Sequence, residues 1–341
     1  MVSTMVTTRA RNVELDAAAR LKDWLEGVAV PGRPDVFVDP EADLDPLGGV
    51  PWGDGSMIFV EESRLPSAQE TVRASPAQVV GYSGEPMWSG SELSLGHDLI
   101  VQLESYATAG YIAIAFPTVL SIRDEYDRSA VLVDAELAER DGLFPEYLTR
   151  ALVTVMDQET WTGTALQNRP SSRLLLGADG ALYRGPRLRP EQVNDAVGEH
   201  PEASSDLNDE DDAFLAGPGA AATRFLGAAR LLRMARPRFG DDLVVAGYGP
   251  GVRFDTVQDG AEAASRRDSV FVLFDGRQYL VADVGTGRIA RVSQDVAGLV
   301  EATLSGQVLS PQSAEALGIA FGRQHEAAWQ VLGRMGVGTP S

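Results

Sequence analysis

The clearest hydrophobic pattern lies in the C-terminal part of the chain. Two apolar runs, residues 270–274 and 279–284, flank the pair Asp275-Gly276, and Gly285-Thr286-Gly287 separates the second run from a third at residues 288–292. Runs of this length predict strands joined by tight turns, and an Asp-Gly pair favours a type I′ turn with two residues at positive φ. We therefore expect three consecutive antiparallel strands.

Helical spacing follows these strands. Ser293 is suited to an N-cap, and one helical face then follows at i, i+3, i+4, i+7 and i+8, formed by Val296, Leu299, Val300, Thr303 and Leu304. Ser310-Pro311 offers an N-cap and an N1 proline for a second helix. Residues 322–335 again show helical spacing. The pattern predicts three strands followed by three helices within residues 266–341.

The N-terminal part alternates predicted helices and strands in an order that indicates no particular topology. Helical spacing predicts helices at residues 13–27, 91–109 and 144–156. Apolar, partly β-branched runs predict strands at residues 35–38, 57–61, 111–116 and 130–133. Gly177 to Gly180 separates two further runs and predicts a hairpin over residues 173–184. This part is therefore expected to be a mixed α/β region.

Composition changes divide the chain into four parts. Residues 1–190 form the mixed α/β domain, and residues 191–218 form an acidic linker or loop because the run from Asp206 to Asp212 repels itself. Residues 219–265 form a connecting segment with a helix over 221–235, stopped by Pro237, and a short strand at 243–246. Residues 266–341 form the C-terminal domain. The expected fold class is α+β.

Charge separates the C-terminal domain from the rest of the chain. The whole chain carries a net charge of −20, whereas residues 266–341 contain seven Arg and seven Asp or Glu, which sum to zero. Because a duplex-binding protein needs a basic surface to displace counterions, this balance argues against nucleic acid as a partner. No run of about 18 apolar residues and no secretory signal are found, so we expect no membrane span and a cytoplasmic location.

Few motifs indicate chemistry. Cysteine is absent, and the three histidines His97, His200 and His325 lack partners at metal-ligand spacing, so we expect no metal site. The glycines from Gly247 to Gly251 lack dinucleotide-binding spacing, and no nucleophile elbow occurs. We therefore assign no catalytic residue and no cofactor.

Arginines are grouped on the helix predicted at residues 221–235 and just beyond it. Arg230, Arg233 and Arg236 lie three residues apart and form a basic stripe after the acidic run. Such a stripe either binds an acidic partner surface or pairs with nearby carboxylates such as the run at Asp209 to Asp212. The sequence leaves both interpretations open.

Residues 291–306 and 329–337 carry a resemblance to a known family. Their pattern resembles the PqqD-like RiPP recognition element, a winged-helix domain that binds leader peptides of ribosomally made, modified peptides. The resemblance covers about a fifth of the chain. It departs at Ser293-Gln294-Asp295, where the family often has Asn-Glu-Thr, and at Ser305-Gly306, where it often has Asp-Gly.

The resemblance implies that a leader peptide adds as an extra strand to the edge of the third strand. An apolar wall on the last helix would receive its side chains, and the two arginines would favour acidic positions in the leader. The peptide-binding residues that it implies are Arg288, Ile289, Ala290, Arg291, Val292, His325, Trp329 and Leu332. The alternative is that Trp329 and Leu332 belong to the core and that the arginines are solvated.

The layout of the whole chain is also similar to the recognition proteins of daptide-type pathways. That similarity implies a non-catalytic protein that binds a precursor peptide and presents it to a partner modifying enzyme such as an oxidoreductase. One alternative is an enzyme of unknown class in residues 34–190 with an accessory winged helix. Another is a winged-helix regulator of transcription, against which the net charge of −20 argues.

Overall fold

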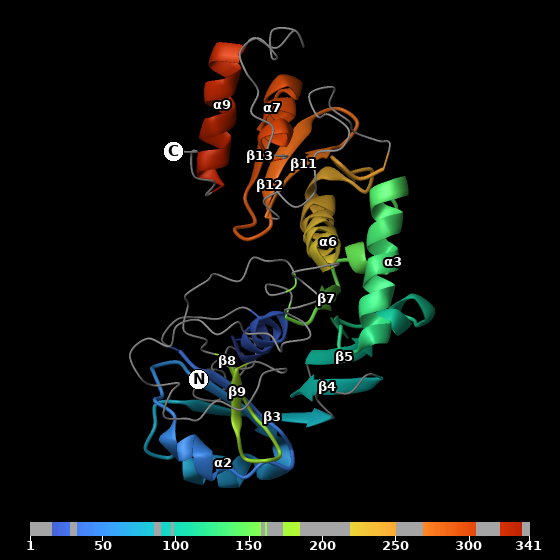
Figure 1. Cartoon of the computed structure of the whole chain (residues 1–341). Coiled ribbons are helices and arrows are strands. Elements are labelled where there is room, and N and C mark those ends of the chain that lie inside the picture. Colours follow the sequence, from blue (N-terminus) through green and yellow to red (C-terminus); the bar gives the residue numbers. More distant parts are fainter. Residues whose placement is uncertain are drawn as a thin grey trace, which may run out of the picture. The chain divides into compact units, whose positions relative to one another are not determined.

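The computed structural model describes residues 16–27, 33–84, 90–96, 99–157, 161, 173–184, 219–249, 269–304 and 321–335. It is a mixed α/β structure with a large mixed sheet and a separate four-stranded antiparallel sheet (Figure 1). The predicted acidic linker, residues 191–218, and the helix predicted at Ser310-Pro311 lie outside the described residues.

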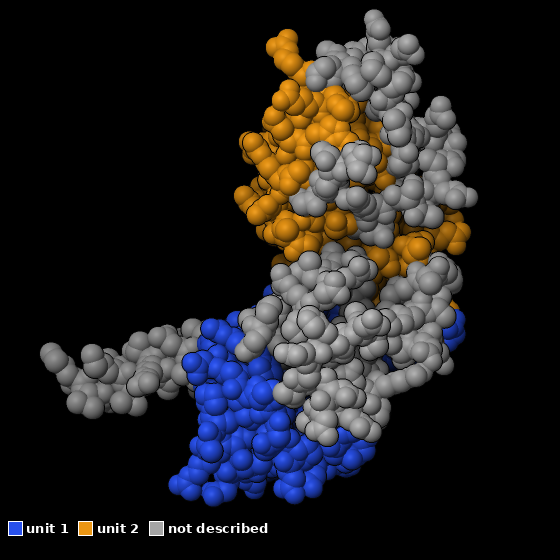
Figure 2. All heavy atoms as spheres, turned by 60° about the vertical axis from the view of Figure 1, so that its left-hand side comes forward, with its two compact units in different colours: residues 1–127, 152–160, 165–213 blue, residues 128–151, 161–164, 214–341 orange. Residues whose placement is uncertain are grey.

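The chain divides into two compact units, each built from several stretches of sequence (Figure 2). Unit 1 comprises Met1–Asp127, Leu152–Thr160 and Ala165–Ala213. Unit 2 comprises Arg128–Ala151, Trp161–Thr164 and Phe214–Ser341. Each unit is therefore completed by residues that are distant in sequence.

Unit 1 is organised around a nine-stranded sheet of order β7-β6-β5-β4-β3-β2-β1-β8-β9. Its strands are β1 (Asp35–Val38), β2 (Met57–Glu61), β3 (Gln78–Gly84), β4 (Ser91–Leu95), β5 (Leu99–Ser105), β6 (Thr118–Ser121), β7 (Val153–Val155), β8 (Arg173–Leu176) and β9 (Leu182–Arg184). β8, β1, β2 and β3 run parallel to one another, as do β5, β6 and β7. The β3–β4, β4–β5 and β8–β9 pairs are antiparallel. The sheet is thus mixed.

Both faces of the central strands are buried. Residues 16–26 are helical, and their Leu21 and Trp24 pack with Phe37 and Phe59 on one face. On the other face, alternate strand residues pack with side chains around η1 (Asp45–Gly49) and α2 (Leu65–Thr71), which follows η2 (Glu62–Arg64). Burial of both faces explains why β1 and β2 are continuous apolar runs in the sequence.

Several N-terminal predictions are confirmed. The strands predicted at residues 35–38 and 57–61 are β1 and β2, with the same bounds. The hairpin predicted over 173–184 is the antiparallel β8–β9 pair. A helix is present at residues 16–26, within the predicted range 13–27.

Four N-terminal predictions are wrong. The helix predicted at residues 91–109 is instead the β4–β5 hairpin followed by η3 (Tyr106–Tyr111), because alternate residues rather than every third or fourth face the core. The strand predicted at residues 111–116 is irregular, and Tyr111 is 89% exposed. Residues 130–133 lie inside α3 (Glu125–Asp141). Residues 144–156 form η4 (Tyr147–Thr149) and β7 instead of one helix.

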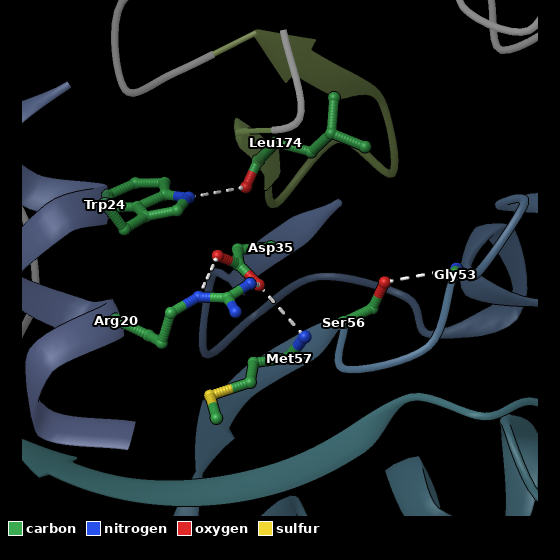
Figure 3. A network of polar contacts seen from close by, with 7 residues as sticks. All are labelled: Arg20, Trp24, Asp35, Gly53, Ser56, Met57 and Leu174. Atoms are coloured by element: carbon green, nitrogen blue, oxygen red, sulfur yellow. Dashed lines mark hydrogen bonds and ion pairs between the residues drawn. The ribbon is translucent and has the colours of Figure 1, made fainter. Parts of the chain in front are cut away.

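A buried polar network joins the helix at residues 16–26 to the starts of β1 and β2 (Figure 3). The Arg20 guanidinium donates two hydrogen bonds to the Asp35 carboxylate, which also accepts the Met57 N–H at 3.0 Å. Trp24 Nε1 donates to the Leu174 carbonyl at 3.2 Å. Burial raises the pKa of Asp35, while the bonds from Arg20 oppose that shift. The ion pair links the helix to the start of β1, and its hydrogen bonds offset part of the cost of burying the two charges.

Replacement of Asp35 by alanine is expected to destabilise unit 1 by about 3–5 kcal/mol, because it leaves the Arg20 charge buried without its carboxylate. The double variant Arg20→Met/Asp35→Asn removes both charges and keeps an acceptor for the Met57 N–H. It should recover most of the loss. Urea unfolding followed by tryptophan fluorescence measures both effects, and an equal loss in the two variants would contradict this account of the pair.

Unit 2 contains the four-stranded antiparallel sheet, of order β10-β11-β12-β13. Its strands are β10 (Val244–Val245), β11 (Val270–Phe274), β12 (Tyr279–Asp283) and β13 (Ile289–Val292). Its helices are α6 (Gly219–Phe239), α7 (Gln294–Leu304) and α9 (Phe321–Arg334), and most of α3 also belongs to it. Strands β11, β12 and β13 confirm the three predicted strands, and α7 and α9 confirm two of the three predicted helices.

The two faces of this sheet are both buried. Val272, Val281 and Ala290 occupy one face and pack with the apolar residues of α7 and α9. Phe271, Leu273, Leu280 and Ala282 point to the other face, and each is at most 3% exposed. The C-terminal end of α6 approaches this second face, where the Phe239 ring lies 6.0 Å from Arg291 Cζ. The sheet therefore leaves mainly its edges accessible.

Two local predictions in unit 2 need correction. Pro237 does not stop α6, which continues to Phe239. Proline removes one N–H near the helix end, but the Gly240 N–H still bonds to the Arg236 carbonyl at 2.9 Å, and Gly240 ends the helix at φ +99°. The Asp275-Gly276 turn is not type I′ because only Gly276 has positive φ. The Asp275 carboxylate instead accepts the N–H groups of Arg277 and Gln278.

Candidate peptide-binding edge

β13 is an edge strand of the four-stranded sheet. It pairs with β12 in the antiparallel register Leu280↔Arg291 and Ala282↔Ile289. Within the part of the chain that the structure describes, no strand pairs with its other side. Its outer side therefore has backbone groups available for a further strand.

The register shows which backbone groups point outward. The Asp283 N–H donates to the Arg288 carbonyl at 3.0 Å, so Arg288 belongs to a hydrogen-bonded pair with β12. Because inward and outward residues alternate along an antiparallel strand, Ala290 and Val292 also face β12. Ile289 and Arg291 then present their N–H and C=O groups at the free edge.

The side chains of β13 divide between the two faces of the sheet. Ala290 and Val292 are half-buried against the core that α7 and α9 share. Ile289 and Arg291 point to the opposite face, where Arg291 lies near Phe239 and remains exposed. The outward-pointing amides thus belong to the residues whose side chains are not part of the α7–α9 core.

The three predicted residues of the last helix lie on α9 but differ in accessibility. Leu332 is fully buried in the core, which matches the alternative interpretation of this residue. Trp329 is half-buried against the same core, and its Nε1 donates to His325 Nε2 at 3.1 Å. Trp329 and His325 therefore keep accessible surface on α9, and Leu332 supports them from the core.

Arg288 makes a contact that the sequence did not indicate. Its Nη1 donates to the backbone carbonyl of Arg334 at 2.6 Å, at the C-terminal end of α9. A cation at this position satisfies a terminal carbonyl and complements the helix dipole. The bond ties the start of β13 to the end of α9. A backbone acceptor carries no residue-type signal, so no sequence pattern could have identified it.

Asp283 holds the turn that leads into β13. The side chain is 3% exposed and accepts the N–H groups of Gly285 and Thr286 at 3.1 and 3.2 Å, together with the Thr286 hydroxyl. The Gly287 N–H bonds to the Asp283 carbonyl at 2.9 Å. Sequence reasoning identified the turn from its glycines but missed this aspartate, although an Asp two residues before a turn residue is a known signal.

Other candidate chemistry is limited among the described residues. There, no group of three or more His, Asp or Glu side chains is placed to hold a metal ion. No helix in the described part is long and apolar enough to cross a membrane. His97, His200 and the end of the predicted Gly247–Gly251 segment lie outside the described residues.

Comparison of the chain with protein-family models, with curated proteins and with solved structures gave no match. The functional proposal therefore depends on the residues of this chain alone. It starts from the edge of β13, whose outward backbone groups can form hydrogen bonds with a further strand.

Asp283→Ala is expected to destabilise unit 2 by about 1–3 kcal/mol, because it removes a buried carboxylate whose three hydrogen bonds hold the turn before β13. Asp275→Ala is the matched control, since Asp275 caps the preceding turn in a more accessible place and its loss exposes donors to water. The midpoint of thermal unfolding measures both, and an equal shift in the two variants would argue against the proposed role of Asp283.

Proposed function

We propose that this protein recognises a precursor peptide by strand addition at β13. The observation that carries the proposal is the outward direction of the Ile289 and Arg291 amides at an edge with which no described strand pairs. The peptide is the leader of a ribosomally made, modified peptide, as the resemblance to the recognition element implies. The protein presents it to a partner modifying enzyme of the oxidoreductase class and has no catalysis of its own.

Burial of both faces of the sheet supports this site. A peptide that pairs with β13 gains main-chain hydrogen bonds without disturbing a packed layer. Its alternate side chains meet the half-buried surfaces of Val292 and Trp329 on one face. On the other face they meet exposed Arg291, which favours an acidic position in the peptide. Backbone pairing supplies affinity, and these side chains set the register.

The order of elements also supports the finer interpretation as a winged helix. Three strands that run directly into α7, followed by α9 against the same core, match the order expected for the recognition element. The Ser293 cap of α7 lies at the expected position, where its hydroxyl accepts the Val296 N–H at 3.4 Å. The additional strand β10 and the approach of α6 are features that this resemblance does not include.

Ile289→Pro is expected to abolish peptide binding, because proline removes the outward N–H and leaves the β12–β13 bonds of Ala290 and Val292 intact. The binding assay is fluorescence polarisation with a labelled leader peptide, taken from a short precursor open reading frame identified beside this gene. Ile289→Ala, which retains the N–H, is the matched control and should weaken binding by less than tenfold.

Circular dichroism of the proline variant establishes that the sheet is intact. Unchanged affinity in Ile289→Pro, or no saturable binding of the leader to the unaltered protein, would refute strand addition at β13.

A further inference from the structure

A pocket in unit 2 is lined by residues outside β13. It has a volume of about 510 Å³ and forms between the η4 region and the C-terminal half of α6. Its lining residues are Glu146, Thr149, Arg150, Ala151, Arg233, Arg236, Pro237 and Asp241. None of them belongs to β13, α7 or α9, so the pocket has no residue in common with the proposed peptide-binding edge.

The charge of the pocket is opposite to that of the chain as a whole. Three arginines and two carboxylates line it, which gives a local net charge of +1 in a protein of net charge −20. The two α6 arginines, Arg233 and Arg236, are half-buried, and Thr149 beside them is buried. Arg150 is at the rim, with 51% of its side chain exposed. The guanidinium groups therefore extend from the interior of the pocket to its mouth.

Hydrogen bonds hold part of this arrangement in place. The Arg236 guanidinium donates to the Thr149 hydroxyl, and that hydroxyl donates to the Glu146 carbonyl at 3.1 Å. The Arg236 Nε is buried and has no acceptor among the described residues. A buried guanidinium N–H without an acceptor is costly, and an anionic ligand would remove that cost.

Glu146 competes for one of the arginines. Its carboxylate lies 2.6 Å from Arg150 Nη2, and the hydrogen bond lowers the pKa of Glu146, so the group is ionised at neutral pH. With 81% of its side chain exposed, Glu146 can move away from Arg150 at little cost. Arg150 is then available to a ligand at the mouth of the pocket.

We propose that this pocket binds a small organic anion through a carboxylate or phosphate group. Guanidinium groups match both oxyanions with paired, charge-assisted hydrogen bonds. The volume is in the range of sites for small molecules, about 300–1,000 Å³. Ala151 and Pro237 provide apolar surface for the carbon skeleton of the ligand. The basic stripe of the sequence thus supplies two of its three arginines, Arg233 and Arg236, to one site.

Isothermal titration of the full chain at low salt tests this assignment, with inorganic phosphate and citrate as the two probes. We expect saturable binding of at least one probe, weakened about tenfold or more by Arg233→Gln or Arg150→Gln, since each removes charged hydrogen bonds. Arg238→Gln is the matched control, because Arg238 is on the same helix end and carries the same charge but does not line the pocket. Its affinity should be unchanged.

Glu146→Gln provides a test that loss of folding cannot imitate. Removal of the competing carboxylate should tighten binding several-fold. Binding of phosphate alone assigns a phosphate ligand, and binding of citrate alone assigns a carboxylate. The absence of saturable binding for both probes overturns the proposal. So does an equal loss in Arg238→Gln and Arg233→Gln, because binding would then follow overall charge and not the pocket.

Discussion

Burial of both faces of the four-stranded sheet is the constraint on which the rest of unit 2 depends. Apolar side chains fill one face with α7 and α9, and a second apolar set is equally buried on the other. Such a sheet has little lateral surface left for recognition, so its accessible backbone groups are at the edges. The two edges are unequal. β10 has two residues, whereas β13 has four and is joined to α9 through Arg288. β13 is therefore the longer of the two edges, which is why the proposed peptide strand is assigned to it.

Sequence reasoning was most successful where turns bounded the apolar runs. Asp275-Gly276 and the glycines around Thr286 separate β11, β12 and β13 so clearly that the strand limits agree with the structure within one residue. The candidate site was predicted only in part. Its residues could be placed on an edge strand and on α9, but the pairing direction of each amide depends on a register that no single strand specifies. Asp283 and the Arg288–Arg334 bond depend on tertiary positions in the same way.

The N-terminal errors share one physical origin. Leu95, Leu99 and Leu103 have the spacing of a helical face. The structure instead buries alternate residues on each strand of a hairpin, namely Leu93 and Leu95 on β4 and Val101 and Leu103 on β5. A short apolar run fits both periods, and partners far along the chain decide between them. Such a distant partner is seen at β1, which pairs with the neighbouring β2 on one side and on the other with β8, more than a hundred residues further along the chain. Arg233 and Arg236 belong to the basic stripe seen in the sequence, but the η4 region that completes the pocket, Arg150 included, was assigned to a helix.

The interleaving of the two units has a consequence for how the chain can be made and divided. Pairing between Asp35 of β1 and Arg173 of β8 closes a loop of more than a hundred residues, so the central sheet of unit 1 is incomplete until the ribosome has passed that point. Residues 128–151 belong to unit 2 and pack against α6, which is synthesised later; Phe144, for example, stacks on Phe225 with ring centroids 5.6 Å apart. During synthesis their apolar side chains are temporarily without partners. Cleavage of any one peptide bond between residues 128 and 213 separates parts of the same unit. Neither unit can therefore be exchanged as one continuous segment of the gene.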